Sequence, residues 1–351
     1  MTTLQSTPDP SQRPDTTVPT RLSVADFTRN AGKAWSMRLI FGAMLMVFSE
    51  IIMWENPTAH TFPEWIGRAI LYLVLGALTI HLAVWLQVRE IAGLAMLSGL
   101  YGLLSGVLIN HDALIGLPLG LVVHALGLQT GAALYALLFF IAVMKGRQPT
   151  RLEIGIAVVI GILWGIWLKW YPIQKSVGWE PTTIETATLY LIGGAVIVGV
   201  LLMVIAPSFR VVREDDLTLK LWEWPIVIIP LVIALILGLL DPTVIPLFPL
   251  LVAIAVGIVI VGALWIQRVP NEPSIMAEML FSLPNPVTFV FLGIAVLLAG
   301  TFSATLIGDN PDSIIGIVTY ILIGIIGSLW LPAASALIGV RVYRRVQGET
   351  G

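Results

Sequence analysis

Residues 34–56 read AWSMRLIFGAMLMVFSEIIMWEN, a predominantly apolar run that is long enough to cross a lipid bilayer as a helix. The first of its two acidic residues, Glu50, stands about one helical turn inside the apolar run, and Glu55 follows at its end. A charged group inside a membrane is costly and marks a candidate functional site. Glu50 is therefore either the solvated end of a membrane helix or the edge of a working site.

The composition of the whole chain points to a membrane environment. Of its 351 residues, 57% are hydrophobic and only 11% are charged, whereas a soluble domain carries about 25% charged residues. Cysteine is absent, which excludes disulfides, thiolate catalysis and Cys-ligated metals. The composition predicts an all-α fold, a polytopic bundle of transmembrane helices.

The apolar runs divide the chain into about ten predicted spans, because each crossing needs roughly 20 apolar residues. The seventh run is short, so it and its neighbour are also open to a re-entrant interpretation. An even division into five and five would give two halves of opposite orientation, as in several transporters. The predicted spans are residues 34–53, 66–86, 91–109, 118–144, 152–170, 184–206, 225–240, 246–265, 287–306 and 314–339.

The basic residues predict the orientation of these spans. Residues 1–33 contain no apolar targeting segment and are predicted to form a disordered cytoplasmic tail. With this tail inside, 16 of the 19 lysines and arginines fall on the inner side and 3 on the outer side. The prediction is a transmembrane domain at residues 34–340 in the cell membrane, with a basic tail at 341–351 and both termini cytoplasmic.

The third span has the clearest packing pattern. Small residues recur in IAGLAMLSGLYGLLSG (91–106) at spacings of 3, 4, 3 and 4, which places them in one stripe along a helix. Small side chains let membrane helices approach closely. The pattern predicts a tightly packed central helix or, as the alternative, a narrow substrate path along the stripe. The stripe consists of Ala92, Ala95, Gly99, Gly102 and Gly106.

The first four spans hold most of the charged and imidazole groups that fall within membrane segments. Glu50 and Arg68 each lie about one turn from the same predicted outer boundary, so they can form a pair. A structural ion pair at the lipid interface is the alternative to a substrate- or ion-binding pocket. His81 lies deeper on the second span and is expected to bond to a neighbouring helix. The candidate binding residues are Glu50, Arg68, His124, Asn110, His111, Asp112, Trp164 and Trp167.

Several functional motifs are absent from the sequence. It contains no phosphate-binding loop, no nucleophile elbow and no paired-histidine zinc motif. We therefore assign no catalytic residue, metal or cofactor. The scattered basic residues argue against nucleic acid as a partner, and the expected partners are the bilayer and a small-molecule or lipid-linked ligand. The sequence does not identify partner proteins in a membrane complex.

Three classes of function remain. A small-molecule transporter or permease is expected to have a cavity that reaches the middle of the membrane between two halves. A membrane enzyme acting on a lipid-linked substrate at the outer leaflet is expected to have a shallow cleft open sideways to lipid. A structural or assembly subunit of a membrane complex is expected to have no cavity.

Overall fold

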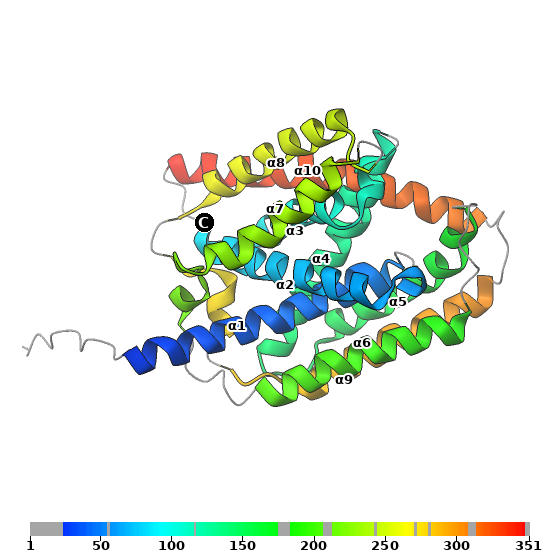
Figure 1. The fold of residues 1–351 in the computed structure, drawn as a ribbon, viewed down its shortest axis with the longest axis horizontal. Helices are drawn as coiled ribbons and strands as arrows, with labels where there is room; N and C mark the ends of the chain where they lie inside the picture. Colours follow the sequence, from blue (N-terminus) through cyan, green and yellow to red (C-terminus); the bar gives the residue numbers. More distant parts are fainter. Residues whose placement is uncertain are drawn as a thin grey trace, which may run out of the picture.

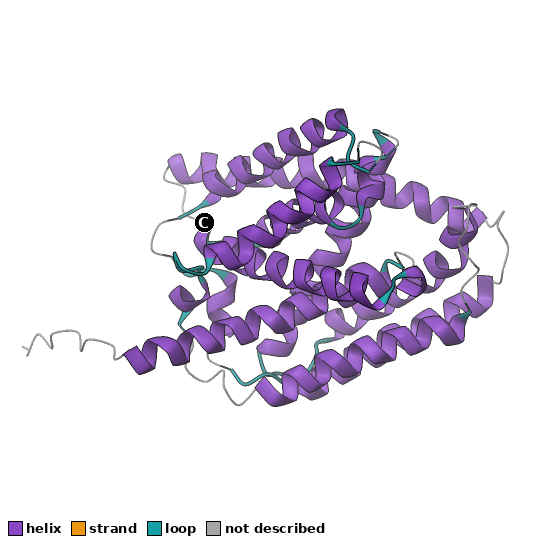
Figure 2. Ribbon diagram, viewed as in Figure 1, coloured by secondary structure: helices purple, strands orange, loops and turns teal. Residues whose placement is uncertain are grey.

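The computed structural model describes residues 24–54, 57–115, 117–174, 183–205, 213–241, 244–269, 272–279, 282–307 and 314–347. Within these ranges every regular element is a helix (Figure 2). The long helices are α1 (Val24–Met46), α2 (Phe62–Trp85), α3 (Ile91–Leu108), α4 (Thr130–Met144), α5 (Arg151–Gln174), α6 (Ile184–Ile205), α7 (Trp224–Leu239), α8 (Leu247–Gln267), α9 (Pro286–Ile307) and α10 (Ile314–Val346). The short elements are η1 (Val47–Ile52), η2 (Pro57–Ala59), η3 (His111–Leu114), η4 (Gly120–Gln129), η6 (Glu214–Leu217) and η7 (Ile275–Met279).

These helices coincide with the apolar runs of the sequence. In the described residues, nine helical segments are long and apolar enough to cross a membrane, and α7, with 16 residues, is shorter. Two of the nine combine elements, since η1 continues α1 and η4 leads directly into α4. For the described residues, the prediction of an all-helical bundle with a short seventh segment is confirmed.

The two terminal helices are longer than the predicted spans. The first helix begins at Val24, inside the segment predicted as a disordered tail, and the last continues to Val346, past the predicted end of the membrane domain. No proline interrupts either extension, so helical hydrogen bonding continues beyond the apolar core. The rest of the predicted tails, residues 1–23 and 348–351, lies outside the described residues.

The first four membrane segments form the core of the bundle. Within their apolar windows 67, 50, 72 and 83% of residues are buried, against 17–33% in the other five. Figure 1 shows α8 and α10 along one edge and α6 and α9 along the opposite edge, with α1–α4 between them. The charged groups of the early spans therefore lie where protein, rather than lipid, surrounds them.

Glycines allow several helix pairs to approach closely. A Cβ atom built on Gly76 of α2 would lie 2.9 Å from the Cα atom of Gly42 on α1. A Cβ atom on Gly165 of α5 would lie 2.1 Å from the carbonyl oxygen of Gly300 on α9. Because α5 and α9 pack together across the expected midpoint of the chain, the helices are interleaved rather than separated into two five-helix halves.

The helix α3 lies at the centre and contacts α2, α4, α7, α8, α10, η3 and η4. Along its small-residue stripe, a Cβ atom at Gly99 would overlap the ring of Trp330, and one at Gly102 would lie 2.3 Å from the carbonyl oxygen of Ala125. Ala92 is buried, whereas Ala95 is only partly buried. Protein atoms thus fill the space beside Gly99 and Gly102, which favours the packing role over a substrate path.

We expect Gly102→Ala to destabilise the protein by about 1–3 kcal/mol, because the added methyl group overpacks the contact with backbone atoms of Ala125 and Thr130. The matched control is Gly131→Ala on α4, where nothing lies within 4 Å of the new methyl group and alanine favours the helix. Thermal unfolding of both variants in detergent measures the difference. A drop in Tm for Gly102→Ala no larger than that for Gly131→Ala would contradict close packing at this position.

Candidate functional site

Glu50 lies in the π-helical turn η1, which continues α1. In a π-helix the backbone hydrogen bonds span five residues, as from the amide of Met53 to the carbonyl of Phe48 (3.1 Å). Such turns are rare and occur frequently at functional sites. The wider turn also displaces backbone carbonyls from the regular ladder, so donors from other helices can reach them.

Two tryptophans of α5 supply these donors. The indole nitrogen of Trp164 donates to the carbonyl of Ile51 (3.2 Å), and that of Trp167 donates to the carbonyl of Met53 (2.8 Å). The two rings share one face of α5 because they are three residues apart. Through these bonds both indole groups hold the backbone of the segment that carries Glu50.

The chain leaves this segment through an unusual backbone conformation. Trp54 has a φ of 47°, in the left-handed region that costs a residue with a side chain about 1–2 kcal/mol. Its side chain is fully buried and meets Tyr190 edge to face, with ring centroids 6.1 Å apart. Burial of this large ring offsets the backbone cost and fixes the direction in which the chain continues.

The carboxylate of Glu50 and three other side chains form a closed ring of hydrogen bonds. Its Oε1 atom accepts hydrogen bonds from Arg68 Nη1 (2.6 Å) and from the hydroxyl of Tyr72 (2.5 Å). The same Arg68 nitrogen donates to Asn110 Oδ1 (2.9 Å), and Asn110 Nδ2 donates to the Tyr72 hydroxyl (3.3 Å). We name these four residues the Glu50 ring; His60 adds its Nε2 atom 3.5 Å from Glu50 Oε2.

The start of α2 positions its share of this ring. Thr61 and Glu64 form a capping box, in which the amide of Thr61 donates to the Glu64 carboxylate (2.6 Å). Arg68 and Tyr72 follow at four-residue spacing, so both side chains project from one face of α2 toward η1. Asn110 comes from the end of α3, where its amide donates to the carbonyl of Ser105 (2.9 Å).

Burial makes the pairing of these charges obligatory. Glu50 has no exposed side-chain surface, whereas Arg68 and His60 retain 21% and 13%. A buried carboxylate is tolerated only when a counter-charge and hydrogen bonds replace its water. Protein groups enclose the carboxylate, and the partly exposed Arg68 and His60 lie beside it. Among the described residues no group of three His, Asp or Glu side chains is placed to hold a metal ion.

The remaining candidate residues lie at different distances from this ring. His111 begins η3, and its pKa is lowered by burial and, to a smaller extent, by the positive charge of Arg68. The side chain of Asp112 lies outside the described part of the structure. His124 is on η4, and the described partners of Glu50 and Arg68 do not include it.

Two residues that contact Glu50 were not among the predicted binding residues. Tyr72 donates directly to Glu50, and its signal in the sequence is its position one turn after Arg68. His60 lies near the outer end of the second span, but its place in a connection between helices gives no register from which to predict contact with Glu50.

A second buried ion pair involves Arg38, which lies midway along the continuous helix formed by α1 and η1, 12 residues before Glu50. Arg38 Nη1 and Glu223 Oε1 are 2.8 Å apart, with 0% and 1% of their side chains exposed. Arg38 Nη2 also donates to the carbonyls of Leu217 (3.2 Å) and Thr218 (3.1 Å). This pair anchors the connection between α6 and α7 to α1.

His81 contributes to the same anchor. Its Nδ1 atom accepts a hydrogen bond from the amide of Leu219 (3.0 Å). The described partner of His81 is thus a connecting segment, whereas the sequence predicted a neighbouring helix. Its ring stacks on Trp85 and meets Trp224 edge to face.

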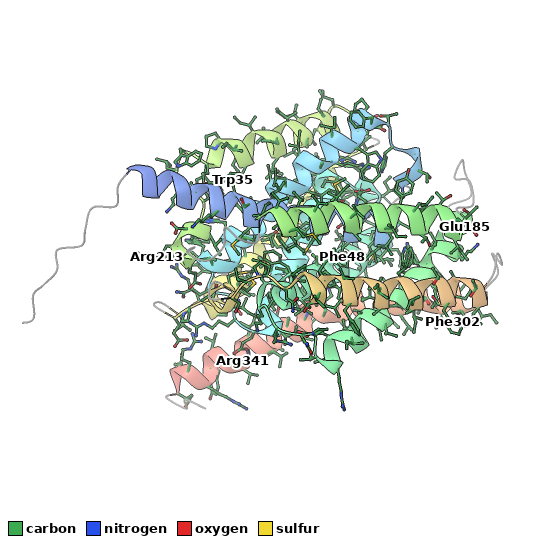
Figure 3. All side chains as sticks on the ribbon, turned by 90° about the horizontal axis from the view of Figure 1, so that it is seen from below. Trp35, Phe48, Glu185, Arg213, Phe302 and Arg341 are labelled. Carbon is green, nitrogen blue, oxygen red and sulfur yellow. The ribbon has the colours of Figure 1, made fainter. Side chains whose placement is uncertain are left out.

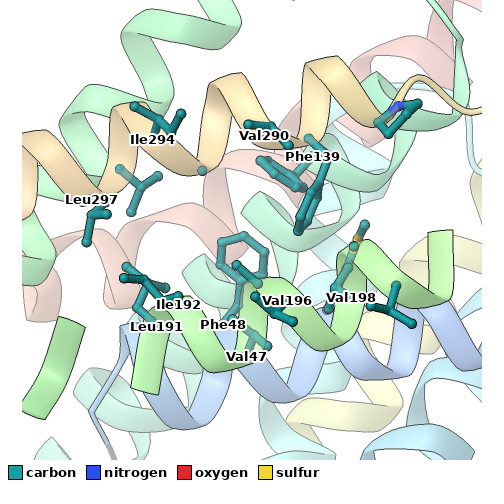
Figure 4. A pocket seen from close by; sticks show the side chains of 18 of the residues that line it. Val47, Phe48, Phe139, Leu191, Ile192, Val196, Val198, Val290, Ile294 and Leu297 are labelled. Atoms are coloured by element: carbon teal, nitrogen blue, oxygen red, sulfur yellow. The ribbon is translucent and has the colours of Figure 1, made fainter. Parts of the chain in front are cut away.

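An apolar cavity of about 370 Å³ lies on another side of η1, between α1, α4, α6 and α9. Figure 4 shows Phe48 of η1 and Phe139 of α4 between the side chains of α6 and α9. Val196 on α6 and Ile294 on α9 line the cavity and are also exposed on the outer surface of the bundle. The cavity therefore lies beneath the groove between α6 and α9, on the face expected to contact lipid.

The helices indicate only the broad class of the protein: they are compatible with a multi-pass membrane protein. No protein-family model matches the sequence, and no curated protein or solved structure shows significant similarity to it.

We expect Arg68→Gln to destabilise the protein by about 3–5 kcal/mol, because it leaves the buried carboxylate of Glu50 without its counter-charge. The double variant Glu50→Gln/Arg68→Gln removes both charges and is expected to recover most of this loss. Unfolding of the single and double variants in detergent measures the coupling between the two positions.

The control for this cycle is the exposed pair of Arg147 and Glu153, whose side chains retain 42% and 22% of their surface. Arg147→Gln is expected to cost no more than about 1 kcal/mol. Strictly additive effects of Glu50→Gln and Arg68→Gln would contradict a buried pair.

Proposed function

We propose that the protein is a permease for a small lipophilic or amphiphilic compound, which enters the apolar cavity from the bilayer between α6 and α9. The observation that carries this proposal is the cavity itself, whose lining combines exposed side chains of α6 and α9 with residues of η1. Its volume of about 370 Å³ falls within the range of about 300–1,000 Å³ that is typical of small-molecule sites. Its walls select for an apolar compound, since they are built from aliphatic and aromatic side chains.

The position of η1 between the cavity and the Glu50 ring supports a transport role. Val47, Phe48 and Ile52 of this turn line the cavity, whereas Glu50 of the same turn faces Arg68 and Tyr72. A change in the charge or pairing of Glu50 alters the turn that forms the cavity wall. Ionisable groups inside a membrane bundle often couple ions or protons to movement of a substrate.

The burial of Glu50 favours this role over catalysis. An enzyme acting on a lipid-linked substrate needs its reactive groups at the substrate, but the carboxylate of Glu50 is enclosed by protein. Two observations keep the enzyme as the second candidate: Arg68 and His60 are partly exposed beside that carboxylate, and the cavity opens sideways between α6 and α9, as expected for a lipid-linked substrate. A Glu50→Gln variant that retains transport of the compound but loses turnover of a lipid-linked substrate would favour the enzyme.

We place the permease in the cell membrane with both termini in the cytoplasm. The support is the predicted distribution of basic residues. In Figure 3, Trp35, Arg213 and Arg341 lie at one end of the bundle, and Glu185 and Phe302 lie at the other. The residues predicted for the inner side thus share one end of the bundle, and Glu185, predicted for the outer side, lies at the other end (Figure 3).

Transport across reconstituted vesicles tests the proposal. The purified protein is incorporated into vesicles, and the movement of three lipophilic dyes, one cationic, one neutral and one anionic, is compared with that in protein-free vesicles. We expect the protein to accelerate at least one dye. We expect Gly199→Phe to slow this dye about tenfold or more, a cost of at least 1.4 kcal/mol, because the new ring points toward Phe289 and fills the cavity.

The control is Gly193→Phe, on the same helix, where nothing lies within 4 Å of a Cβ atom and the cavity is not reached. It is expected to transport at the rate of the unmodified protein. The proposal fails if the protein moves none of the three dyes, or if the two glycine variants are equally impaired.

A further inference from the structure

At the end of the bundle opposite the Glu50 ring, a polar cavity of about 150 Å³ lies between three segments. These are the connection from α2 to α3, the end of α8 with its following residues, and the last turns of α10. Figure 3 places Arg341, which lines this cavity, at the same end as Trp35 and Arg213. The polar donors that line it are Gln87, Arg89, Gln267, Arg341 and Arg345.

The cavity has an excess of hydrogen-bond donors. Within the described residues, three buried donors of the lining have no acceptor (Arg89 Nε, Arg89 Nη2 and Gln267 Nε2), against one buried acceptor without a donor, Gln87 Oε1. Arg89 pairs with Glu272 through its other terminal nitrogen, and Arg341 pairs with Glu90. Buried donors without acceptors are costly, so a ligand that fits here is one that accepts several hydrogen bonds.

The charges around the cavity indicate that this ligand is an anion. Three arginines and two glutamates line it, which leaves a formal charge of +1. Burial and the like charge of Arg345 lower the pKa of Arg89, while Glu214 acts in the opposite direction. Two guanidinium groups that repel each other across a small cavity are stabilised by a negative group between them.

The volume of the cavity and the arrangement of its donors favour some anions over others. The volume is that of about five water molecules, at roughly 30 Å³ each, so a group of phosphate size fits together with solvent. Arginine presents a planar fork of donors that matches phosphate oxygens. Donors converge from three separate segments, and a tetrahedral group with several acceptor oxygens meets them better than a planar carboxylate does.

Neighbouring aromatic residues place the cavity at the level of lipid headgroups. Trp85 and Trp265 are 39% and 51% exposed, and the guanidinium of Arg268 lies over both rings, 5.9 and 5.5 Å from their centroids. Each ring is close in sequence to a glutamine that lines the cavity. Exposed tryptophans of membrane proteins gather at the boundary between hydrocarbon and headgroups.

We propose that this cavity binds a phosphate group, which is carried either by the headgroup of an anionic phospholipid or by a soluble compound. Basic pockets between membrane helices on the cytoplasmic side bind such headgroups in other proteins. The site is separate from the apolar cavity of the proposed permease, with which it shares no lining residue.

Thermal unfolding of the full-length protein in detergent tests this site. The additions compared are phosphatidylglycerol, phosphatidylcholine, inorganic phosphate, and chloride at the ionic strength of the phosphate. Stabilisation by phosphatidylglycerol alone assigns the phosphate to a lipid headgroup, and stabilisation by inorganic phosphate assigns it to a soluble source. If neither raises Tm above its own control, the proposal is wrong.

We expect Arg345→Gln to lower by about tenfold the affinity for whichever addition raises Tm, because the substitution removes a charged donor from the cavity. Arg344→Gln is the matched control, since it makes the same change one residue away on α10 but does not line the cavity. Equal weakening by the two variants would show attraction to general charge and overturn the proposal.

A second variant, Arg89→Lys, keeps a positive charge opposite Glu272 but removes the planar fork. We expect it to fold and to bind phosphate several-fold more weakly. If Arg89→Lys and Arg345→Gln both bind phosphate as tightly as the unmodified protein does, the proposal of a phosphate site is also wrong.

Discussion

The cost of burying charge inside an apolar bundle governs how α1 and its neighbours are arranged. This helix carries Arg38 at the middle of the α1–η1 segment and is continued by η1 with Glu50, and both side chains are fully buried. Each requires a counter-charge and further hydrogen bonds. The partners of Glu50 come from α2 and from His60 just before it, and those of Arg38 come from the connection between α6 and α7. One helical segment is thereby fixed at two points, to the neighbouring α2 through Glu50 and to a connection distant in sequence through Arg38.

A second constraint is the need to satisfy backbone groups where α-helical hydrogen bonding is interrupted. Two tryptophans meet it in similar ways. Trp164 packs its ring on Gly300 and donates to the carbonyl of Ile51 at the end of η1. Trp330 packs on Gly99 and donates to the carbonyl of Leu126 in η4 (2.6 Å). In each case a glycine makes room for the ring, and the indole N–H donates to a carbonyl of a π-helical turn.

Hydropathy predicted the elements of the fold because the bilayer fixes the length of an apolar helix. The ends of the middle spans follow the prediction closely, whereas those of α1 and α10 do not, since a helix is free to continue where lipid ends. The pairing of Glu50 with Arg68 could be proposed from the depths of two consecutive helices. Glu223 could not be, because it lies in a connecting segment and meets Arg38 only through packing far along the chain. The grouping of His124 with Glu50 used depth alone, although direction around the helix decides contact.

The two faces of η1 connect the Glu50 ring to the apolar cavity. Successive residues of an α-helix differ by about 100° in direction and 1.5 Å in rise. Converting a π-helical turn to an α-helical one changes the register by one residue, so side chains on either face of it rotate together. Phe48 therefore cannot leave the cavity by this route while Glu50 keeps its bonds to Arg68 and Tyr72. The bonds that hold the buried carboxylate therefore also constrain the position of Phe48 in the cavity wall, because both side chains belong to the same turn.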